Sequence, residues 1–164
     1  MELNIRPALP RDAAVLAAIE SECFPAAEAC GKEQMEKRLT AFPECFFLAE
    51  YQGEAVGFIN GCCTDRPVLG DELYGNAALH RPEGPWQTVF GLDVRPMWQH
   101  RGIARQLMDC FIADAKARGM DGVILTCKDH LIGFYESFGF VWQGVSKSEH
   151  GGARWNDMVL TFIS

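Results

Sequence analysis

The segment that most constrains this chain is a short glycine-containing turn at residues 99–104, Gln-His-Arg-Gly-Ile-Ala. It follows an apolar, strand-like run, Val89 to Val94, and leads into a long helical pattern. A strand that turns through glycine into a helix presents backbone N–H groups without intrahelical partners, together with the positive end of the helix dipole. Such a helix start binds phosphate or pyrophosphate. The segment therefore predicts a strand–turn–helix unit with an anion-binding turn.

The length and composition predict one globular domain. A chain of 164 residues, 48% of them hydrophobic, is long enough to bury a sizeable core, and we expect a single domain over residues 1–164. No apolar run approaches the ~20 residues that a membrane span needs. The N-terminus lacks the basic region and apolar core of a secretory signal. We therefore expect a cytoplasmic location and no membrane partner.

The cysteines fit the same location. There are seven, an odd number, and none forms a C-x-x-C pair. In a chain without a signal segment this is typical of reduced, mostly buried thiols. The pattern predicts no metal site.

The charge balance is acidic. The formal net charge is −7, and no cluster of Lys and Arg offsets it. This argues against nucleic acid as a partner, whereas cationic small molecules such as amines are compatible with it.

Hydrophobic periodicity and turn residues predict the element order βααβββαβαββ, a mixed α/β (α+β) class with helices on both faces of the sheet. Residues 64–87 contain three prolines and three glycines and are predicted to form a long loop. The expected strands cover residues 3–6, 45–51, 55–63, 89–94, 123–126, 140–147 and 155–162, and the expected helices cover 12–24, 32–39, 103–119 and 131–138.

Three segments of this chain resemble the GCN5-related N-acetyltransferase (GNAT) family. They are Gly-Leu-Asp-Val at 91–94, the turn at 99–104, and Gly-Phe-Tyr-Glu-Ser-Phe-Gly-Phe at 133–140. The last is more specific than the glycine turn. Further segments resemble the arylalkylamine (serotonin) N-acetyltransferase branch: Leu-His-Arg-Pro at 79–82, Cys-Lys-Asp-His-Leu at 127–131, Glu44 after Pro43, and the Phe58-Ile59 strand.

The resemblance implies the GNAT fold, with a central mixed sheet in which parallel strands 91–94 and 123–127 splay apart. The pantetheine arm of the coenzyme then pairs with one strand like an added strand. The co-substrate implied is acetyl-CoA, without a metal. The implied function is direct transfer of an acetyl group, within a ternary complex, to a primary amine of a small molecule, with arylalkylamines as the narrower expectation. The alternatives are a protein or peptide N-acetyltransferase and a non-catalytic acyl-CoA-binding module. Homodimers are common in this family, and a homodimer is the assembly to test.

The resemblance also implies the coenzyme site. The backbone N–H groups of residues 100 to 105 would hold the pyrophosphate, with Arg101 and Arg105 in reach of phosphate oxygens. Phosphate binding is favoured for Arg101, while a solvated helix charge is equally open for Arg105. The expected coenzyme-binding residues are Leu92, Asp93, Val94, Gln99, His100, Arg101, Gly102, Ile103, Ala104, Arg105, Cys127, Phe134 and Tyr135.

Tyr135 is the residue expected to carry chemistry. In the resembled family the tyrosine of this motif protonates the departing thiolate, and a phenol suits that step. The alternative is a core tyrosine that fills a helix–sheet junction.

The usual base of the family is missing from this chain. Two histidines of the arylalkylamine branch would fall at Thr88 and Phe90, and neither residue is a base. Three explanations stay open. In the first, another side chain acts as the base, and the candidates are His80, Glu22, Glu28 and Asp93. In the second, the amine arrives neutral and needs only positioning. In the third, the protein binds the coenzyme and has little turnover. His80 is the best single candidate because an imidazole titrates near neutral pH. A loop histidine bonded to backbone is its alternative.

Aromatic residues could line an acceptor pocket beside Glu22 and Glu28, which would suit an aryl or alkyl amine. Plain core positions are the alternative for each of them. They are Phe24, Phe42, Phe47, Trp86, Phe90 and Trp155, and Pro25 is a further candidate lining residue.

Overall fold

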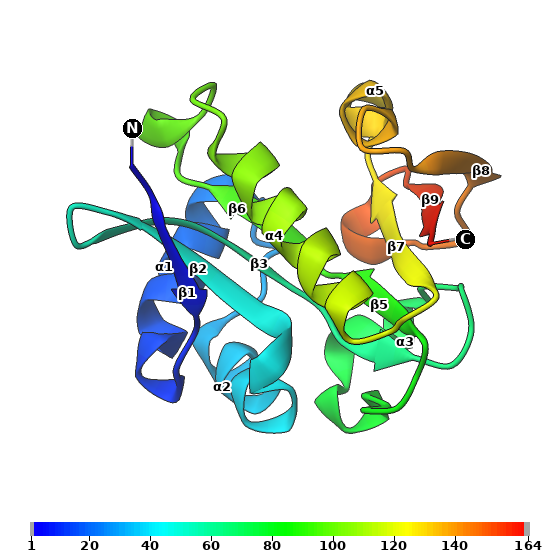
Figure 1. Cartoon of the computed structure of the whole chain (residues 1–164), viewed down its shortest axis with the longest axis horizontal. Helices are drawn as coiled ribbons and strands as arrows, with labels where there is room; N and C mark the ends of the chain where they lie inside the picture. Colours follow the sequence, from blue (N-terminus) through cyan, green and yellow to red (C-terminus); the bar gives the residue numbers. More distant parts are fainter. Residues whose placement is uncertain (1, 163–164) are drawn as a thin grey trace. The chain divides into compact units, whose positions relative to one another are not determined.

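The computed structural model describes residues 2–162 (Figure 1). The chain divides into two compact units, each built from two segments. The first unit comprises the residues up to Gly61 together with Gly91–Phe111, and the second comprises Cys62–Phe90 and the residues from Ile112 onwards. The expectation of a single domain over residues 1–164 stays a prediction.

The first unit contains a four-stranded antiparallel sheet in the order β1-β2-β3-β6. Its strands are β1 (Asn4–Pro7), β2 (Phe46–Tyr51), β3 (Glu54–Asn60) and β6 (Gly91–Val94). Strand β6 therefore lies at an edge of this sheet.

Helices cover both faces of that sheet. On one face lie α1 (Ala13–Cys23) and α2 (Lys32–Ala41), which bury Leu16 and Leu39 among other residues. On the other face lies the first half of α4 (Ile103–Ala117), where the ring of Phe111 meets that of Phe47 edge to face. Short 3-10 turns connect the elements: η1 (Pro10–Asp12), η2 (Pro43–Cys45) and η4 (Pro96–Trp98).

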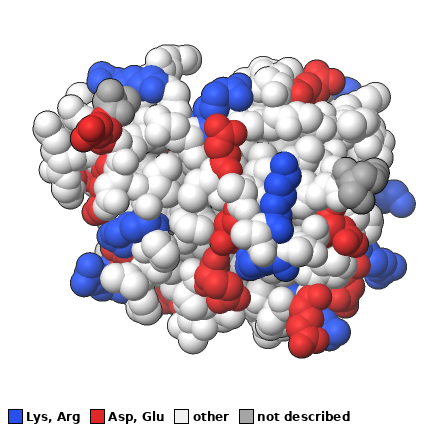
Figure 2. All heavy atoms as spheres, in the orientation of Figure 1, with Lys and Arg blue, Asp and Glu red and all other residues white. Residues whose placement is uncertain are grey.

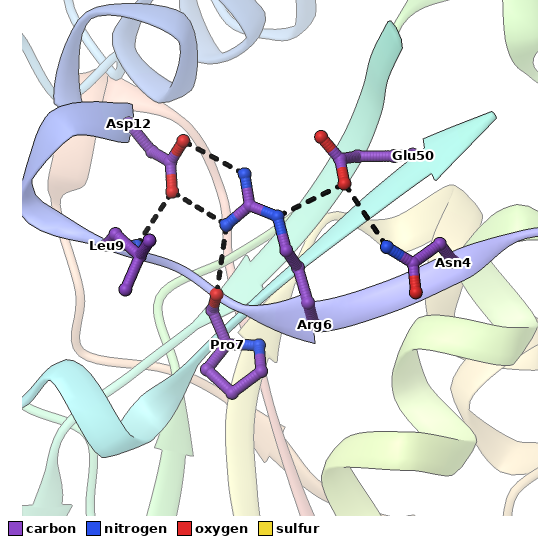
Figure 3. A network of polar contacts seen from close by, with 6 residues as sticks. All are labelled: Asn4, Arg6, Pro7, Leu9, Asp12 and Glu50. Atoms are coloured by element: carbon purple, nitrogen blue, oxygen red, sulfur yellow. Dashed lines mark hydrogen bonds and ion pairs between the residues drawn. The ribbon is translucent and has the colours of Figure 1, made fainter. Parts of the chain in front are cut away.

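A polar network fixes the start of α1 against the sheet (Figure 3). The Arg6 guanidinium donates to both carboxylate oxygens of Asp12, at 2.9 and 3.0 Å, and to Glu50 on β2 at 3.1 Å. Asp12 also accepts from the Leu9 N–H at 2.7 Å. The bonds from Arg6 hold the pKa of the Asp12 carboxyl below its usual range. Asp12 precedes the helix as expected, but its side chain ties the chain to β1 rather than capping the helix.

The second unit contains a five-stranded mixed sheet in the order β4-β5-β7-β9-β8, in which β5 and β7 are parallel and the other pairs antiparallel. The strands are β4 (Cys63–Thr64), β5 (Trp86–Val89), β7 (Gly122–Cys127), β8 (Val141–Val145) and β9 (Asn156–Thr161). Its helical segments are α3 (Asp71–Gly75), η3 (Ala77–Leu79), η5 (Asp129–Leu131), α5 (Ile132–Glu136) and η6 (His150–Gly152), together with the end of α4.

The expected α/β class with a mixed sheet is confirmed, and three local predictions are wrong. The run 55–63 is divided between the two sheets, because β3 ends at Asn60 and β4 begins at Cys63. The run 89–94 is two strands rather than one: β5 ends at Val89 and pairs with β7, whereas β6 begins at Gly91 and pairs with β3. The apolar run shows no sign of this break, because a change of hydrogen-bonding partner does not alter hydropathy.

The predicted loop at 64–87 contains α3, η3 and the start of β5. Helix α3 has only five residues, too few to be stable alone. Long-range contacts support it: the Asp71 carboxylate accepts from the Glu149 N–H at 3.0 Å and from the Ser148 hydroxyl. No local pattern could have predicted them.

Acidic and basic side chains are interspersed on the face of the molecule drawn in Figure 2. Within residues 2–162, no helix combines the length and apolar character that crossing a membrane requires.

Candidate active site

The turn at 99–102 joins β6 to α4 within the first unit. The Gln99 side chain donates through Nε2 to the Val94 carbonyl at 3.1 Å, so the turn is tied to the end of the strand. The N–H of Gln106 donates to the Gly102 carbonyl at 3.1 Å and closes the first turn of the helix. Ile103 is buried at the start of α4 and anchors that helix to the core.

Two residues of the turn have left-handed backbone conformations, His100 at φ 64° and Gly102 at φ 81°. Arg101 lies between them, with an ordinary negative φ. Alternation of this kind turns successive N–H groups toward one side, as in anion-binding nests. A Cβ at Gly102 would meet no atom within 4 Å, so the space beside this residue is open. The turn therefore has the backbone geometry that phosphate binding requires.

The two arginines differ in their surroundings. The Arg101 guanidinium lies 5.1 Å from the centroid of the Trp98 ring, a cation–π contact that orients it beside the turn. Arg105 is exposed on the first turn of α4. Phosphate contacts for both arginines stay predictions.

Strand β6 carries Leu92, Asp93 and Val94. Its pairing with β3 leaves the opposite edge without a strand of the same sheet in the described residues, and that edge could accept an added strand. Side chains alternate along a strand, so Asp93 points to the α1 face, where it is 1% exposed. Its carboxylate is therefore directed into the core of the unit, and only its backbone remains for contact with a coenzyme.

In the second unit, Cys127 ends β7 and is buried. Burial, with a smaller effect from Asp129, raises the pKa of the Cys127 thiol to about 11. It is therefore a neutral thiol at physiological pH. Tyr135 is 8% exposed, and its ring packs edge to face on Phe134 and Phe140, with centroids at 5.1 and 5.9 Å. The Tyr135 ring is part of the core, as the alternative interpretation expected, and a role for its hydroxyl stays a prediction.

His80 is bonded to backbone. Its Nδ1 accepts from the Cys63 N–H at 3.0 Å. A neutral imidazole that accepts through Nδ1 carries its proton on Nε2, so neither nitrogen has a lone pair available for a substrate. This is the contact that the alternative interpretation of His80 expected, and its role as a base stays a prediction.

Thr88 and Phe90, which occupy the positions of the two histidines of the arylalkylamine branch, cannot act as bases. Thr88 is buried and donates through Oγ1 to the Cys62 carbonyl at 3.0 Å. Phe90 lies against Tyr74, with ring centroids 4.8 Å apart. Among the other candidates, Glu22 is paired with Arg95 and Glu28 is half-buried.

Some of the aromatic residues expected to line an acceptor pocket lie in the hydrophobic core, and others belong to an aromatic cluster. Phe42 stacks on Phe46 in the core of the first unit, and Phe47 packs on Phe111. In the second unit a cluster runs through four residues: Phe90, Tyr74, His150 and Trp155. Sequence reasoning missed Tyr74 and His150, because both belong to segments that looked like loop or exposed turn.

Sequence reasoning also missed a buried polar cluster in the first unit. Glu20, Arg38 and Asn60 lie with Asp93 at the interface of α1 and α2 with the sheet, each at most 6% exposed. A signal was present: Glu20 lies four residues after buried Leu16, and Arg38 lies between the buried residues Met35 and Leu39. A charged residue on the apolar face of a helix is seldom buried without a partner.

No group of three or more His, Cys, Asp or Glu residues suited to holding a metal ion occurs in the described part of the chain.

An edge strand, a left-handed glycine turn and a helix start together define a protein that can bind a phosphorylated ligand along its backbone. The chain matches the model of the Acetyltransferase (GNAT) family over residues 13–140. The chain belongs to this family, which confirms the family and the fold expected from the sequence.

Individual relatives agree with the assignment. Serotonin N-acetyltransferase of Mesocricetus auratus is 28% identical over 135 residues, which cover 80% of this chain and 64% of that protein. The chain thus spans less than two thirds of the length of that relative. The structure is similar to that of a GNAT-like decarboxylase, GphF, in complex with isobutyryl-CoA, with a TM-score of 0.83, 21% identity and coverage of 96% of this chain and 98% of the other. It is also similar to yncA of Salmonella typhimurium, a putative acetyltransferase with its cofactor acetyl-CoA, with a TM-score of 0.72, 16% identity and coverage of 99% and 95%.

Proposed function

We propose that this protein is an acetyl-CoA-dependent N-acetyltransferase whose acceptor is a primary amine of a small molecule. The observation that carries the proposal is the turn at 99–102: it has the nest geometry and open space that a pyrophosphate needs, in a chain of the acetyltransferase family. Two structural neighbours are complexes with acyl-CoA or acetyl-CoA, which supports the same co-substrate here.

In the proposed reaction the neutral amine attacks the thioester carbonyl and forms a tetrahedral intermediate. The C–S bond then breaks, the acetyl group remains on nitrogen, the nitrogen loses one proton to water, and the coenzyme leaves as a thiolate. Tyr135 is the proposed donor of the proton that this thiolate takes. Cys127 is protonated and buried, which favours direct transfer over an acyl-cysteine intermediate.

The similarity to a serotonin N-acetyltransferase supports arylalkylamines as the narrower class of acceptor. The aromatic cluster of the second unit supports it as well, because Tyr74, Phe90, His150 and Trp155 offer apolar and π surfaces to an aryl group.

The test is release of the coenzyme thiol from acetyl-CoA over a panel of arylalkylamines, alkylamines, polyamines and short peptides. We expect turnover with an arylalkylamine. Preference for peptides would favour the protein N-acetyltransferase alternative. Binding of acetyl-CoA by calorimetry without turnover on any acceptor would favour the binding-module alternative.

We also propose a cytoplasmic location, since all seven cysteines are thiols in the structure. A homodimer stays a prediction, which sedimentation of the purified protein would test.

A further inference from the structure

The aromatic cluster of the second unit contains one group that can act as a base. The ring centroids of Phe90 and Tyr74 are 4.8 Å apart, and the Tyr74 ring stacks on the His150 imidazole at 5.1 Å, with 15° between the planes. The ring centroids of His150 and Trp155 are 5.9 Å apart. Phenyl, phenol and indole rings do not take up a proton near neutral pH, whereas an imidazole does. His150 is therefore the base of this cluster.

The cluster lies at the carboxyl end of the two parallel strands of its sheet. Phe90 directly follows β5, and the Tyr74 hydroxyl is 3.0 Å from the Thr126 hydroxyl on β7. Tyr74, Phe90 and His150 are half-buried and so lie at the surface of the unit. Ligands of open α/β sheets bind outside the carboxyl ends of the strands. A ligand at this end of the sheet can reach the imidazole without entering the core.

Hydrogen bonds hold the backbone that carries His150. Trp155 donates through Nε1 to the His150 carbonyl at 2.8 Å. On the other side of His150 in the sequence, the Asp71 carboxylate accepts from the Ser148 hydroxyl and from the Glu149 N–H. The imidazole is thus fixed from both directions along the chain and by the ring that it stacks on. A group held in this way is positioned in advance for a bound substrate.

The aromatic rings around His150 suit an arylalkylamine. The aryl group of such an acceptor can pack on Phe90 and Tyr74, and ring faces also attract an ammonium group. Because only a short alkyl chain separates the aryl group from the nitrogen, the ammonium group then lies within reach of the imidazole.

We propose that His150 is the general base of the reaction and accepts the proton that the substrate ammonium group must lose. This rests on the proposed function. One N–H bond of the ammonium group breaks and its electron pair stays on that nitrogen, while a new N–H bond forms on the imidazole. The neutral amine attacks the thioester, and the imidazolium returns its proton to solvent.

The charges around His150 leave the imidazole as the group that titrates near neutral pH. Arg154, which precedes Trp155, is paired with Asp129 at 3.4 Å. The other ionisable groups around the imidazole are a phenol, two carboxyls and an ammonium: Tyr74 and Asp71 on α3, Glu149 in the same segment, and Lys128, whose Nζ lies 5.6 Å from the centroid of the Trp155 ring. Among these kinds of group, only an imidazole ordinarily changes its charge near neutral pH.

The decisive experiment compares two acceptors of nearly equal shape on the full chain. Phenethylamine is an ammonium ion at neutral pH, whereas O-benzylhydroxylamine has an oxygen in place of one CH₂ and is already neutral. His150→Phe keeps a flat ring beside Tyr74 and removes the base. We expect kcat/KM for phenethylamine to fall by about 100-fold at neutral pH, and that for O-benzylhydroxylamine to change by less than about twofold. The loss for phenethylamine should shrink as the pH rises, because more of the free amine is then neutral before it binds.

A second variant and a control separate the base from the packing. His150→Gln keeps a hydrogen-bonding side chain without a titrating group, and it should show the same selective loss. His130→Phe is the matched control: His130 is an exposed histidine of η5 in the same unit, and both amines should react at the wild-type rate.

The outcomes distinguish failure of this inference from failure of the proposed function. A wild-type protein that acetylates neither amine overturns both. A wild-type protein that acetylates phenethylamine, with no loss in the His150 variants or with equal losses for the two amines, overturns the role of His150 as a base alone. A loss for phenethylamine that stays the same as the pH rises overturns it as well, and leaves His150 a stacking residue.

Discussion

At the scale of single residues, burial decides what each predicted group can do. Burial keeps Cys127 a thiol, a backbone hydrogen bond occupies Nδ1 of His80, and alternation along β6 turns the Asp93 carboxyl into the core. The residue type indicated which reactions each side chain could support, and burial and hydrogen bonding in the folded protein determine which of them remain available.

Tyr135 offers the first test at this scale. Tyr135→Phe keeps the ring that packs on Phe134 and Phe140 and removes only the hydroxyl. We expect kcat to fall by about 100-fold, because proton donation to the thiolate is lost, with the affinity for acetyl-CoA roughly unchanged. Steady-state kinetics and calorimetry measure the two effects. Unchanged kcat across the pH range would show that the ring is structural alone.

At the scale of elements, a few side chains set where strands and helices begin. The turn at 99–102 depends on two left-handed residues, and the start of α1 depends on the ion pairs of Arg6 with Asp12 and Glu50 (Figure 3). A single substitution can therefore disrupt either the turn or the ion pairs.

The turn can be tested with a control of equal backbone strain. Gly102→Glu places bulk and negative charge where the pyrophosphate is proposed to bind, and we expect it to abolish detectable binding of acetyl-CoA in calorimetry. Gly53 in the β2–β3 turn has nearly the same φ, 83° against 81°, and open space around its Cβ position. Gly53→Glu should therefore bind acetyl-CoA like the wild type. Equal loss in both variants would point to strain rather than to the anion site.

The Arg6–Asp12 pair makes stability depend on pH. The pKa of Asp12 is lower in the folded protein than in the unfolded chain, so its stabilisation is present above the unfolded pKa and is lost as pH falls through the folded pKa. We expect Asp12→Ala to lower the free energy of unfolding by about 3 kcal/mol at pH 7 and by much less in strong acid. Urea unfolding at several pH values measures the difference. A constant difference would mean that the carboxylate contributes no charge interaction.

At the scale of the whole molecule, contacts between distant segments build what local patterns could not show. Helix α3 is tied to the β8–β9 connection through Asp71, which accepts from Ser148 and from the Glu149 N–H. The same contact brings Tyr74 to His150, whose rings stack at 5.1 Å.

Removing the hydrogen bonds to Asp71 should increase the mobility of the segment between β8 and β9. Asp71→Ala deletes the acceptor of both bonds, at a cost of about 1 kcal/mol for an exposed pair of this kind. We expect faster proteolytic cleavage within residues 146–153 and little change in overall thermal stability. Glu72→Ala, the neighbouring exposed acid, should cleave at the wild-type rate. Identical cleavage of both variants would show that the connection is held by other contacts.

The sequence by itself determined the family, the order of the main elements and the place of the glycine turn before α4. These rest on features that neighbouring residues carry, such as periodicity, turn glycines and the spacing of a motif. Tertiary structure alone decided the rest: the break between β5 and β6 at Phe90, the helix within the expected loop, and the burial of Glu20 against Asp93. The physical reason is that each of these depends on which distant segment a residue meets, and a carboxyl group changes its proton affinity only once the fold has removed it from water.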